Sequence, residues 1–184
     1  MDYRKRLREI HCQPPEERAK RNIRRIEVAI GVSLPESYRL FLAKCGGWWG
    51  DICCPCDEPN PLGDSHVNSE FHVADEVYGL LDSTITPRNM ITIGTGNFAK
   101  YTCLSVAGID RGAVYVLDGE LRAFRSDKEL LLRYPGMPDS IRNYLKLRRS
   151  QSLPQKPAGY DNIYLLATTF DEYLSRCISM EDCG

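Results

Sequence analysis

Four cysteines and two histidines between positions 45 and 72 are the residues best suited to chemistry. The run Cys53-Cys54-Pro55-Cys56 contains a Cys-x-x-Cys spacing, and zinc in tetrahedral sites binds thiolates together with imidazoles. The other half of such a site is neither a second Cys-x-x-Cys nor a standard histidine pair. We therefore favour reduced cysteines that pack as small apolar groups. The alternative is a zinc-stabilised module or small zinc enzyme, with the candidate ligands Cys53, Cys56, His66 and His72 and with Cys45 close in sequence.

Patterns typical of catalysis are missing from the sequence. Its three histidines, at positions 11, 66 and 72, accompany no Gly-x-Ser-x-Gly or similar nucleophile turn. The run Gly94-Thr95-Gly96-Asn97 lacks the third glycine of a dinucleotide fingerprint and the Gly-Lys-Ser/Thr end of a P-loop, so it predicts a tight turn. We expect neither catalytic residues nor a cofactor.

Charged residues are distributed unevenly along the chain. Residues 1–44 carry 11 basic and 6 acidic side chains, whereas residues 45–87 carry eight acidic side chains and no Lys or Arg. The formal net charge of −1 hides this contrast. Such asymmetry indicates a charged partner surface. The alternative is a solvated acidic loop beside a basic helix.

Two tryptophans, Trp48 and Trp49, open the acidic segment. Aromatic side chains beside a charged rim are typical of protein-binding hot spots, although we expect one of the two to lie in the core. The candidate partner-binding residues are Trp48, Trp49, Asp51, Asp57, Glu58, Asp75 and Glu76.

A second charged surface is predicted near the amino terminus. Arg18, Arg21 and Arg25 lie at helical spacing and could bind phosphates, which leaves open a nucleic-acid-associated regulator. A solvated basic face of an amphipathic helix explains the same spacing. The balanced overall charge gives no general reason to expect nucleic acid or an anionic membrane.

Two helices are predicted ahead of the acidic segment. The first runs from the prolines at 14 and 15 to Ile30 and ends at Gly31. The second is expected to use Ser33 as its cap, with Glu36 completing a capping box. Its apolar stripe repeats at helical spacing as far as the glycines at 46 and 47, and consists of Tyr38, Phe41, Leu42 and Cys45.

The rest of the chain predicts mainly strands, followed by helices. Residues 46–70 hold so many glycines and prolines that we expect a long loop without a regular element. Strands are predicted at 71–81, 90–94, 101–106, 112–117 and 121–124, the third and fourth as a hairpin. Helices are predicted at 126–134 and 139–147, a linker at 150–159, and a last helix after a capping box at Thr169 to Glu172.

This order describes a single α+β domain over residues 1–184, with an N-terminal helix pair, a central, mainly antiparallel twisted sheet and C-terminal helices packed on it. A Cys/Pro-rich insertion is expected at about 46–70 and a variable helical or linker segment at about 130–160. The charged opening residues and the absence of any long apolar run predict a cytoplasmic protein with reduced thiols and no membrane partner.

The motif order resembles that of the SUKH superfamily, the Smi/Knr cell-wall-assembly-regulator family. The resemblance depends on the run from Ile26 to Leu42 with its Leu-Pro-Glu-x-Tyr entry, and on the Lys-Cys-Gly-Gly that follows. The strands at 91–94, 101–104 and 112–118 and the helix at 169–174 follow in the order that this family uses.

The resemblance implies a non-enzymatic, protein-binding α+β domain. Many bacterial members are thought to be immunity proteins against toxins, often nucleases. A toxin domain with a basic surface would fit the acidic segment, because opposite charges speed association and improve complementarity. We therefore expect a protein partner, most plausibly such a toxin.

Overall fold

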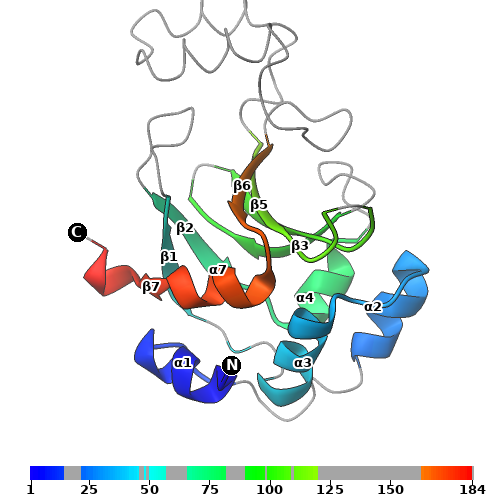
Figure 1. Cartoon of the computed structure of the whole chain (residues 1–184), viewed down its shortest axis with the longest axis horizontal. Coiled ribbons are helices and arrows are strands. Elements are labelled where there is room, and N and C mark those ends of the chain that lie inside the picture. Colours follow the sequence, from blue (N-terminus) through cyan, green and yellow to red (C-terminus); the bar gives the residue numbers. More distant parts are fainter. Residues whose placement is uncertain are drawn as a thin grey trace, which may run out of the picture.

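Seven strands form one antiparallel sheet, which curls around a helical layer (Figure 1). The computed structural model describes residues 1–14, 22–45, 48, 50–56, 66–81, 90–97, 99–108, 110–119 and 163–183. The strand order is β6-β5-β4-β3-β2-β1-β7, so consecutive strands pair from β1 to β6 and the last strand returns beside the first. The strands are β1 (Asp51–Pro55), β2 (His66–Phe71), β3 (Met90–Thr95), β4 (Lys100–Ser105), β5 (Val114–Asp118), β6 (Ile163–Ala167) and β7 (Ile178–Ser179).

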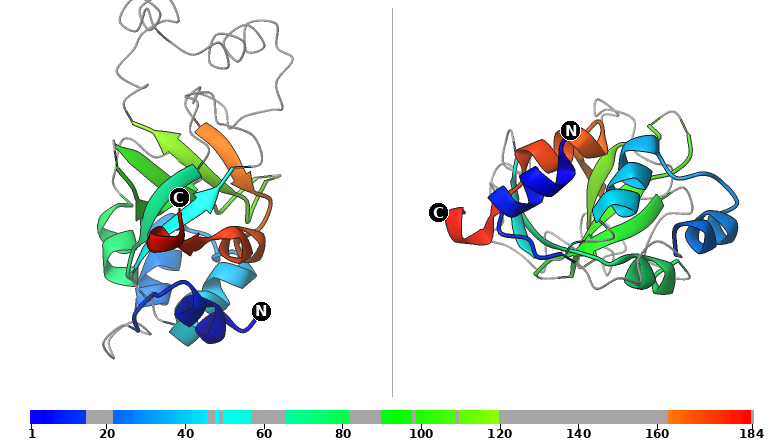
Figure 2. Two further views of the ribbon diagram at one scale, coloured as in Figure 1. Left: turned by 90° about the vertical axis from the view of Figure 1, so that its left-hand side faces the viewer. Right: turned by 90° about the horizontal axis from the view of Figure 1, so that it is seen from below.

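Helices at the two ends of the chain pack together on one side of the sheet (Figures 1 and 2). Helix α3 contacts both α1 and α7, while α2 lies against α4. The helical segments are α1 (Tyr3–Glu9), α2 (Asn22–Ile30), α3 (Glu36–Cys45), α4 (Ala74–Gly79), α7 (Phe170–Arg176) and the short 3-10 helix η3 (Met180–Asp182). The predicted α+β class and antiparallel sheet are therefore confirmed.

An aromatic cluster joins the helices to the sheet. Phe41 of α3 lies 4.9 Å, between ring centroids, from Phe170 of α7 and 5.7 Å from Phe71 of β2. Tyr38 packs on Phe170 as well, with 4.9 Å between centroids. Ring pairs at these separations stabilise a core beyond the area that they bury. The stripe predicted for α3 is confirmed, since all four of its residues are buried.

The start of α3 differs from its prediction. The helix begins at Glu36, and the carbonyl of Pro35 accepts its first backbone hydrogen bond from Arg39, at 2.9 Å. Ser33 therefore lies outside the helix, and its hydroxyl accepts a hydrogen bond from Arg111 at 3.3 Å. The expectation of a Ser33 cap is wrong, because proline takes the position that serine would need.

Two further predictions fail between residues 46 and 81. Residues 51–55 and 66–71 form β1 and β2, not a loop without a regular element. Residues 74–79, expected in a strand, form helix α4, because the Glu76 carboxylate accepts a hydrogen bond from the Val73 amide at 3.0 Å and closes the first turn. Both errors concern short elements, where local patterns decide little.

The later strands and the last helix agree with the sequence. Strands β4 and β5 pair from Lys100 opposite Asp118 to Leu104 opposite Val114, which confirms the hairpin. Thr169 caps α7 by accepting a hydrogen bond from the Glu172 amide at 3.1 Å. The predictions for 121–124, 126–134, 139–147 and 150–159 lie outside the described residues.

Helix α1 and strands β6 and β7 were not expected. Asp2 caps α1 through the Lys5 amide at 3.2 Å, and Arg6 donates to the Leu174 carbonyl of α7 at 3.0 Å. Strand β7 pairs with β1, with Cys53 opposite Ile178. The end of the chain is thereby placed beside β1. In the part of the chain that is described, no helix has the length and apolar character that a membrane span requires.

Candidate functional site

The candidate site lies on the face of β1 and β2 that is turned away from the core. Successive side chains of a strand point to opposite faces, so each strand divides its residues between two environments. Those that join the core are Ile52, Cys54, Val67 and Phe71. We call the opposite side the outer face; alternation assigns to it Asp51, Cys53, His66, Asn68 and Glu70.

A pair of carboxylates stands at one end of this outer face. Asp51 of β1 is the direct cross-strand partner of Glu70 of β2, and both side chains are exposed. Among the described residues, no Lys, Arg or His forms an ion pair with either of them. Like charges directly opposite each other destabilise a strand pair. The pairing of Asp51 with Glu70 is therefore unfavourable for the two strands by themselves.

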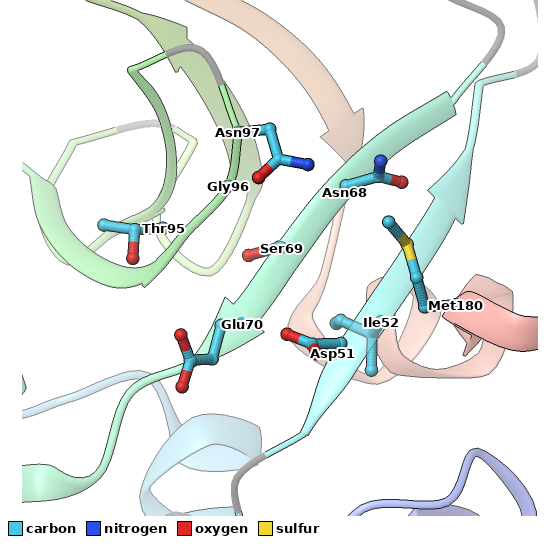
Figure 3. A pocket seen from close by; sticks show the side chains of 9 residues that line it. All are labelled: Asp51, Ile52, Asn68, Ser69, Glu70, Thr95, Gly96, Asn97 and Met180. Carbon is cyan, nitrogen blue, oxygen red and sulfur yellow. The ribbon is translucent and has the colours of Figure 1, made fainter.

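A small polar pocket of about 160 Å³ lies beside these carboxylates (Figure 3). Among the described residues, the buried Oδ1 atom of Asn68 has no hydrogen-bond partner. The β3–β4 turn comes very close to β2 here, because a Cβ at Gly96 would lie only 1.9 Å from the Asn68 carbonyl oxygen. The pocket is lined by Asp51, Ile52, Asn68, Ser69, Glu70, Thr95, Gly96, Asn97 and Met180. We call it the acidic pocket.

Two of the predicted partner-binding residues, Asp75 and Glu76, occupy the first turn of α4. Asp75 and Glu76 are both exposed. The Glu76 carboxylate already accepts the Val73 amide, so it contributes to the helix start as well as to the surface charge. Asp57, Glu58 and Trp49 lie outside the described residues.

Trp48 does not form part of a binding surface. Its side chain is only 6% exposed and packs in the main core. The expectation that Trp48 contacts a partner is therefore corrected, because an indole in the core is not available to another protein. The prediction that one of the two tryptophans lies in the core is confirmed by Trp48.

The basic and acidic segments meet at the contact between α2 and α4. The guanidinium carbon of Arg25 lies 4.3 Å from the centroid of the Tyr78 ring, which is a cation–π contact. Arg25 thus already has a partner within the fold. The two oppositely charged segments are therefore adjacent at this contact.

Two of the four predicted metal ligands come together and two do not. The ligand atoms of Cys53, His66 and Cys183 all lie within 4.8 Å of one another. Cys56 packs against the main core, and the His72 Nε2 atom is 3.0 Å from the Thr95 hydroxyl oxygen. Cys53 and Cys56, the two cysteines of the Cys-x-x-Cys run, do not come together, because side chains three residues apart in an extended chain point to opposite sides.

The cysteines differ in whether they form a disulfide bond. The structure joins Cys53 and Cys183 in a disulfide, contrary to the expectation of free thiols, while the six other cysteines form no disulfide bond. Burial raises the pKa of Cys12 to about 12 and that of Cys45 to about 11. Such thiols remain protonated and unreactive near neutral pH.

One serine–histidine contact resembles part of a catalytic triad but has the wrong geometry. The His11 Nδ1 atom lies 3.4 Å from the Ser179 hydroxyl and 3.3 Å from a Glu181 carboxylate oxygen. A triad needs the two partners on different ring nitrogens, so that one orients the ring while the other moves the proton. Here both partners share Nδ1, and no proton relay results.

Comparison with protein families identifies the chain. A model of the SMI1/KNR4 family (SUKH-1) matches residues 19–176. The chain belongs to this family. SUKH-1 proteins are known as immunity proteins in toxin systems and are generally non-catalytic. Among curated proteins, no relative of this SUKH-1 chain matches.

Sequence patterns alone did not single out three residues of the SUKH-1 chain's outer face: Asn68, Glu70 and Cys183. For the first two, the signal is the alternation in His-Val-Asn-Ser-Glu-Phe, which places positions 66, 68 and 70 on one side. For Cys183 there is no comparable signal, because its place depends on the pairing of β7 with β1.

Proposed function

We propose that this SUKH-1 protein is an immunity protein that binds and neutralises a toxin domain with a basic surface, and that the acidic pocket receives a cationic side chain of that toxin. The observation that carries the proposal is the exposed Asp51–Glu70 pair, which no cation balances within the described residues. In a site of this kind the two carboxylates repel each other in the free protein, and a bound positive charge offsets that repulsion.

The size of the pocket favours a side chain over a metabolite. Small-molecule sites usually enclose about 300 Å³ or more, and the acidic pocket encloses about 160 Å³. Its rim presents carboxylate oxygens from Asp51 and Glu70, and Asn68 adds a polar side chain to the lining. An arginine guanidinium offers five donors and no acceptor, and it pairs with carboxylates in a bidentate manner. We therefore infer an arginine of the toxin as the occupant.

Acidic residues around the pocket would speed association with the basic toxin. Asp75 on α4 adds exposed negative charge, and Asp57 and Glu58 belong to the same acidic segment of the sequence. Toxins that act on nucleic acids need basic surfaces, so a nuclease is the toxin class that this charge suits best. Such an association takes place in the cytoplasm, where the toxin would act, and it should weaken as salt is added.

The proposal can be tested with any toxin domain that a neighbouring gene is found to encode. Co-expression of both in a bacterial host should restore growth that the toxin alone prevents. Calorimetric titration with a catalytically inactive toxin should give a complex that the double substitution Asp51→Asn, Glu70→Gln weakens by about tenfold or more. The control Glu9→Gln removes a carboxylate on α1, where it pairs with Arg6 at 3.4 Å, and should leave the affinity unchanged.

Growth arrest despite co-expression, together with no measurable complex, would refute the immunity function. A complex whose affinity is the same with and without the double substitution would refute the role of the acidic pocket alone.

A further inference from the structure

Cys53, His66 and Cys183 bring two sulfur atoms and an imidazole nitrogen together from three parts of the chain. Cys53 belongs to β1, His66 to β2, and Cys183 follows η3 at the carboxyl end. All three ligand atoms lie within 4.8 Å of one another. We propose that, when the two thiols are reduced, these three residues bind a zinc ion that clasps the end of the chain to the sheet.

Strand pairing brings Cys53, His66 and Cys183 close together even without the disulfide bond. Cys53 pairs with Asn68, so His66 lies two residues along β2 on the same outer face. On the other side of β1, Ile178 of β7 is the direct partner of Cys53. Cys183 then follows a short turn in which its amide donates to the Met180 carbonyl at 3.3 Å. Strand pairing and this turn therefore preorganise the site.

The dimensions suit zinc. Zinc lies about 2.3 Å from thiolate sulfur and about 2.0–2.1 Å from imidazole nitrogen, so tetrahedral ligand atoms are separated by roughly 3.5–3.8 Å. The three ligand atoms lie within 4.8 Å of one another, so they are already near that spacing, and the two sulfurs can move apart once they are reduced. A water molecule supplies the fourth ligand, since His66 and Cys183 are only half-buried.

The charge and proton balance also suit zinc. Two thiols release two protons as they bind the ion, and the imidazole binds in its neutral form, so the cluster of Zn²⁺ and two thiolates carries no net charge. No electron is transferred in this step. The disulfide requires the removal of two electrons and two protons from the same thiols, and a thiol reductant such as glutathione reverses it.

The other cysteines do not offer a comparable site in the described part of the chain. Cys12, Cys45, Cys54, Cys103 and Cys177 are buried in the two apolar clusters of the fold. Cys56, the partner of Cys53 by sequence spacing, packs towards the main core. Cys56 is therefore the natural control: it has the same chemistry and lies three residues away in the sequence, but on the opposite side.

A zinc clasp at this position would also fix one wall of the acidic pocket. Met180 lines that pocket and lies three residues before Cys183 (Figure 3). Binding of zinc would hold η3 against β1 and thus hold Met180 in place. The clasp does not depend on toxin binding, so the two proposals can fail separately.

The test uses the full chain, purified with a thiol reductant and then titrated with Zn²⁺ under anaerobic conditions. Native mass spectrometry should show one zinc per chain, and Co²⁺ in its place should give the visible absorption of a tetrahedral ion with thiolate ligands. Zinc should also raise the melting temperature. Cys183→Ser and His66→Gln should each weaken zinc binding by at least about tenfold, whereas Cys56→Ser should bind zinc like the unchanged protein.

Cys183→Ser is the main variant because its side chain is half-buried, whereas Cys53 is fully buried and its replacement could disturb folding. Circular dichroism verifies that each variant is folded. Failure of the reduced protein to bind zinc would overturn the proposal. Equal affinity in Cys183→Ser, or loss of binding in Cys56→Ser alone, would overturn it as well.

Discussion

Removal of one charge from the carboxylate pair on the outer face should stabilise the protein. Replacing Asp51 by Asn removes one of two like charges that stand directly opposite each other on β1 and β2. Cross-strand charge pairs change stability by roughly 0.2–1 kcal/mol. Both side chains are exposed, which screens their repulsion, so we expect Asp51→Asn to stabilise the protein by about 0.5 kcal/mol.

The second substitution sharpens this prediction. Glu70→Gln should give a similar gain, because either change alone removes the repulsion. The double variant should then be no more stable than either single variant, which gives a coupling energy of about 0.5 kcal/mol in a double-mutant cycle. Glu9→Gln changes the net charge by the same amount but breaks a 3.4 Å ion pair with Arg6, so it should be neutral or slightly destabilising.

Urea unfolding at low and high salt provides the assay. The gain from Asp51→Asn should shrink in about 1 M salt, where the Debye length is about 3 Å. Destabilisation by Asp51→Asn, or additive effects of the two substitutions, would refute the reasoning. Either result would mean that the two carboxylates do not repel each other in the folded chain.

Three other substitutions test local features of the fold. Thr169→Ala removes the hydroxyl that accepts the Glu172 amide, and should cost about 1 kcal/mol in urea unfolding; an unchanged midpoint would contradict the cap. Gly96→Ala places a Cβ 1.9 Å from the Asn68 carbonyl oxygen, so thermal unfolding should occur at a lower temperature, and a stable variant would contradict this close approach. Burial lowers the pKa of His72, so the unfolded chain binds a proton at this position before the folded chain does, and the protein loses stability as the pH falls below about 6.5. His72→Gln should lose less stability over this pH range, and an equal loss would contradict the effect of burial.

The parts of the fold that the sequence predicts are those whose signal is local. The α3 stripe from Tyr38 to Cys45 repeats at helical spacing, and Thr169 marks the start of α7 by its own hydrogen bond. The β4–β5 hairpin has two apolar runs around a short turn. In each case the residues that decide the structure lie within a few positions of one another.

The parts that could not be predicted depend on partners far along the chain. Strand β1 has only a short apolar run before Pro55, and it becomes a strand because β2 and β7 pair with both its edges. Asp51 was identified from its charge, but its position opposite Glu70 follows only from that register. Likewise Cys183 reaches Cys53 across a sequence separation of 130 residues, which no local pattern encodes.

The proposed immunity function depends on the binding of a toxin's cationic side chain in the acidic pocket. Calorimetric titration of the inactive toxin domain against the unchanged protein and the Asp51→Asn, Glu70→Gln variant tests it most directly. The variant should be at least as stable as the unchanged protein and yet bind the toxin about tenfold or more weakly, with a smaller dependence on salt. Equal affinity and equal salt dependence for the two proteins would contradict it.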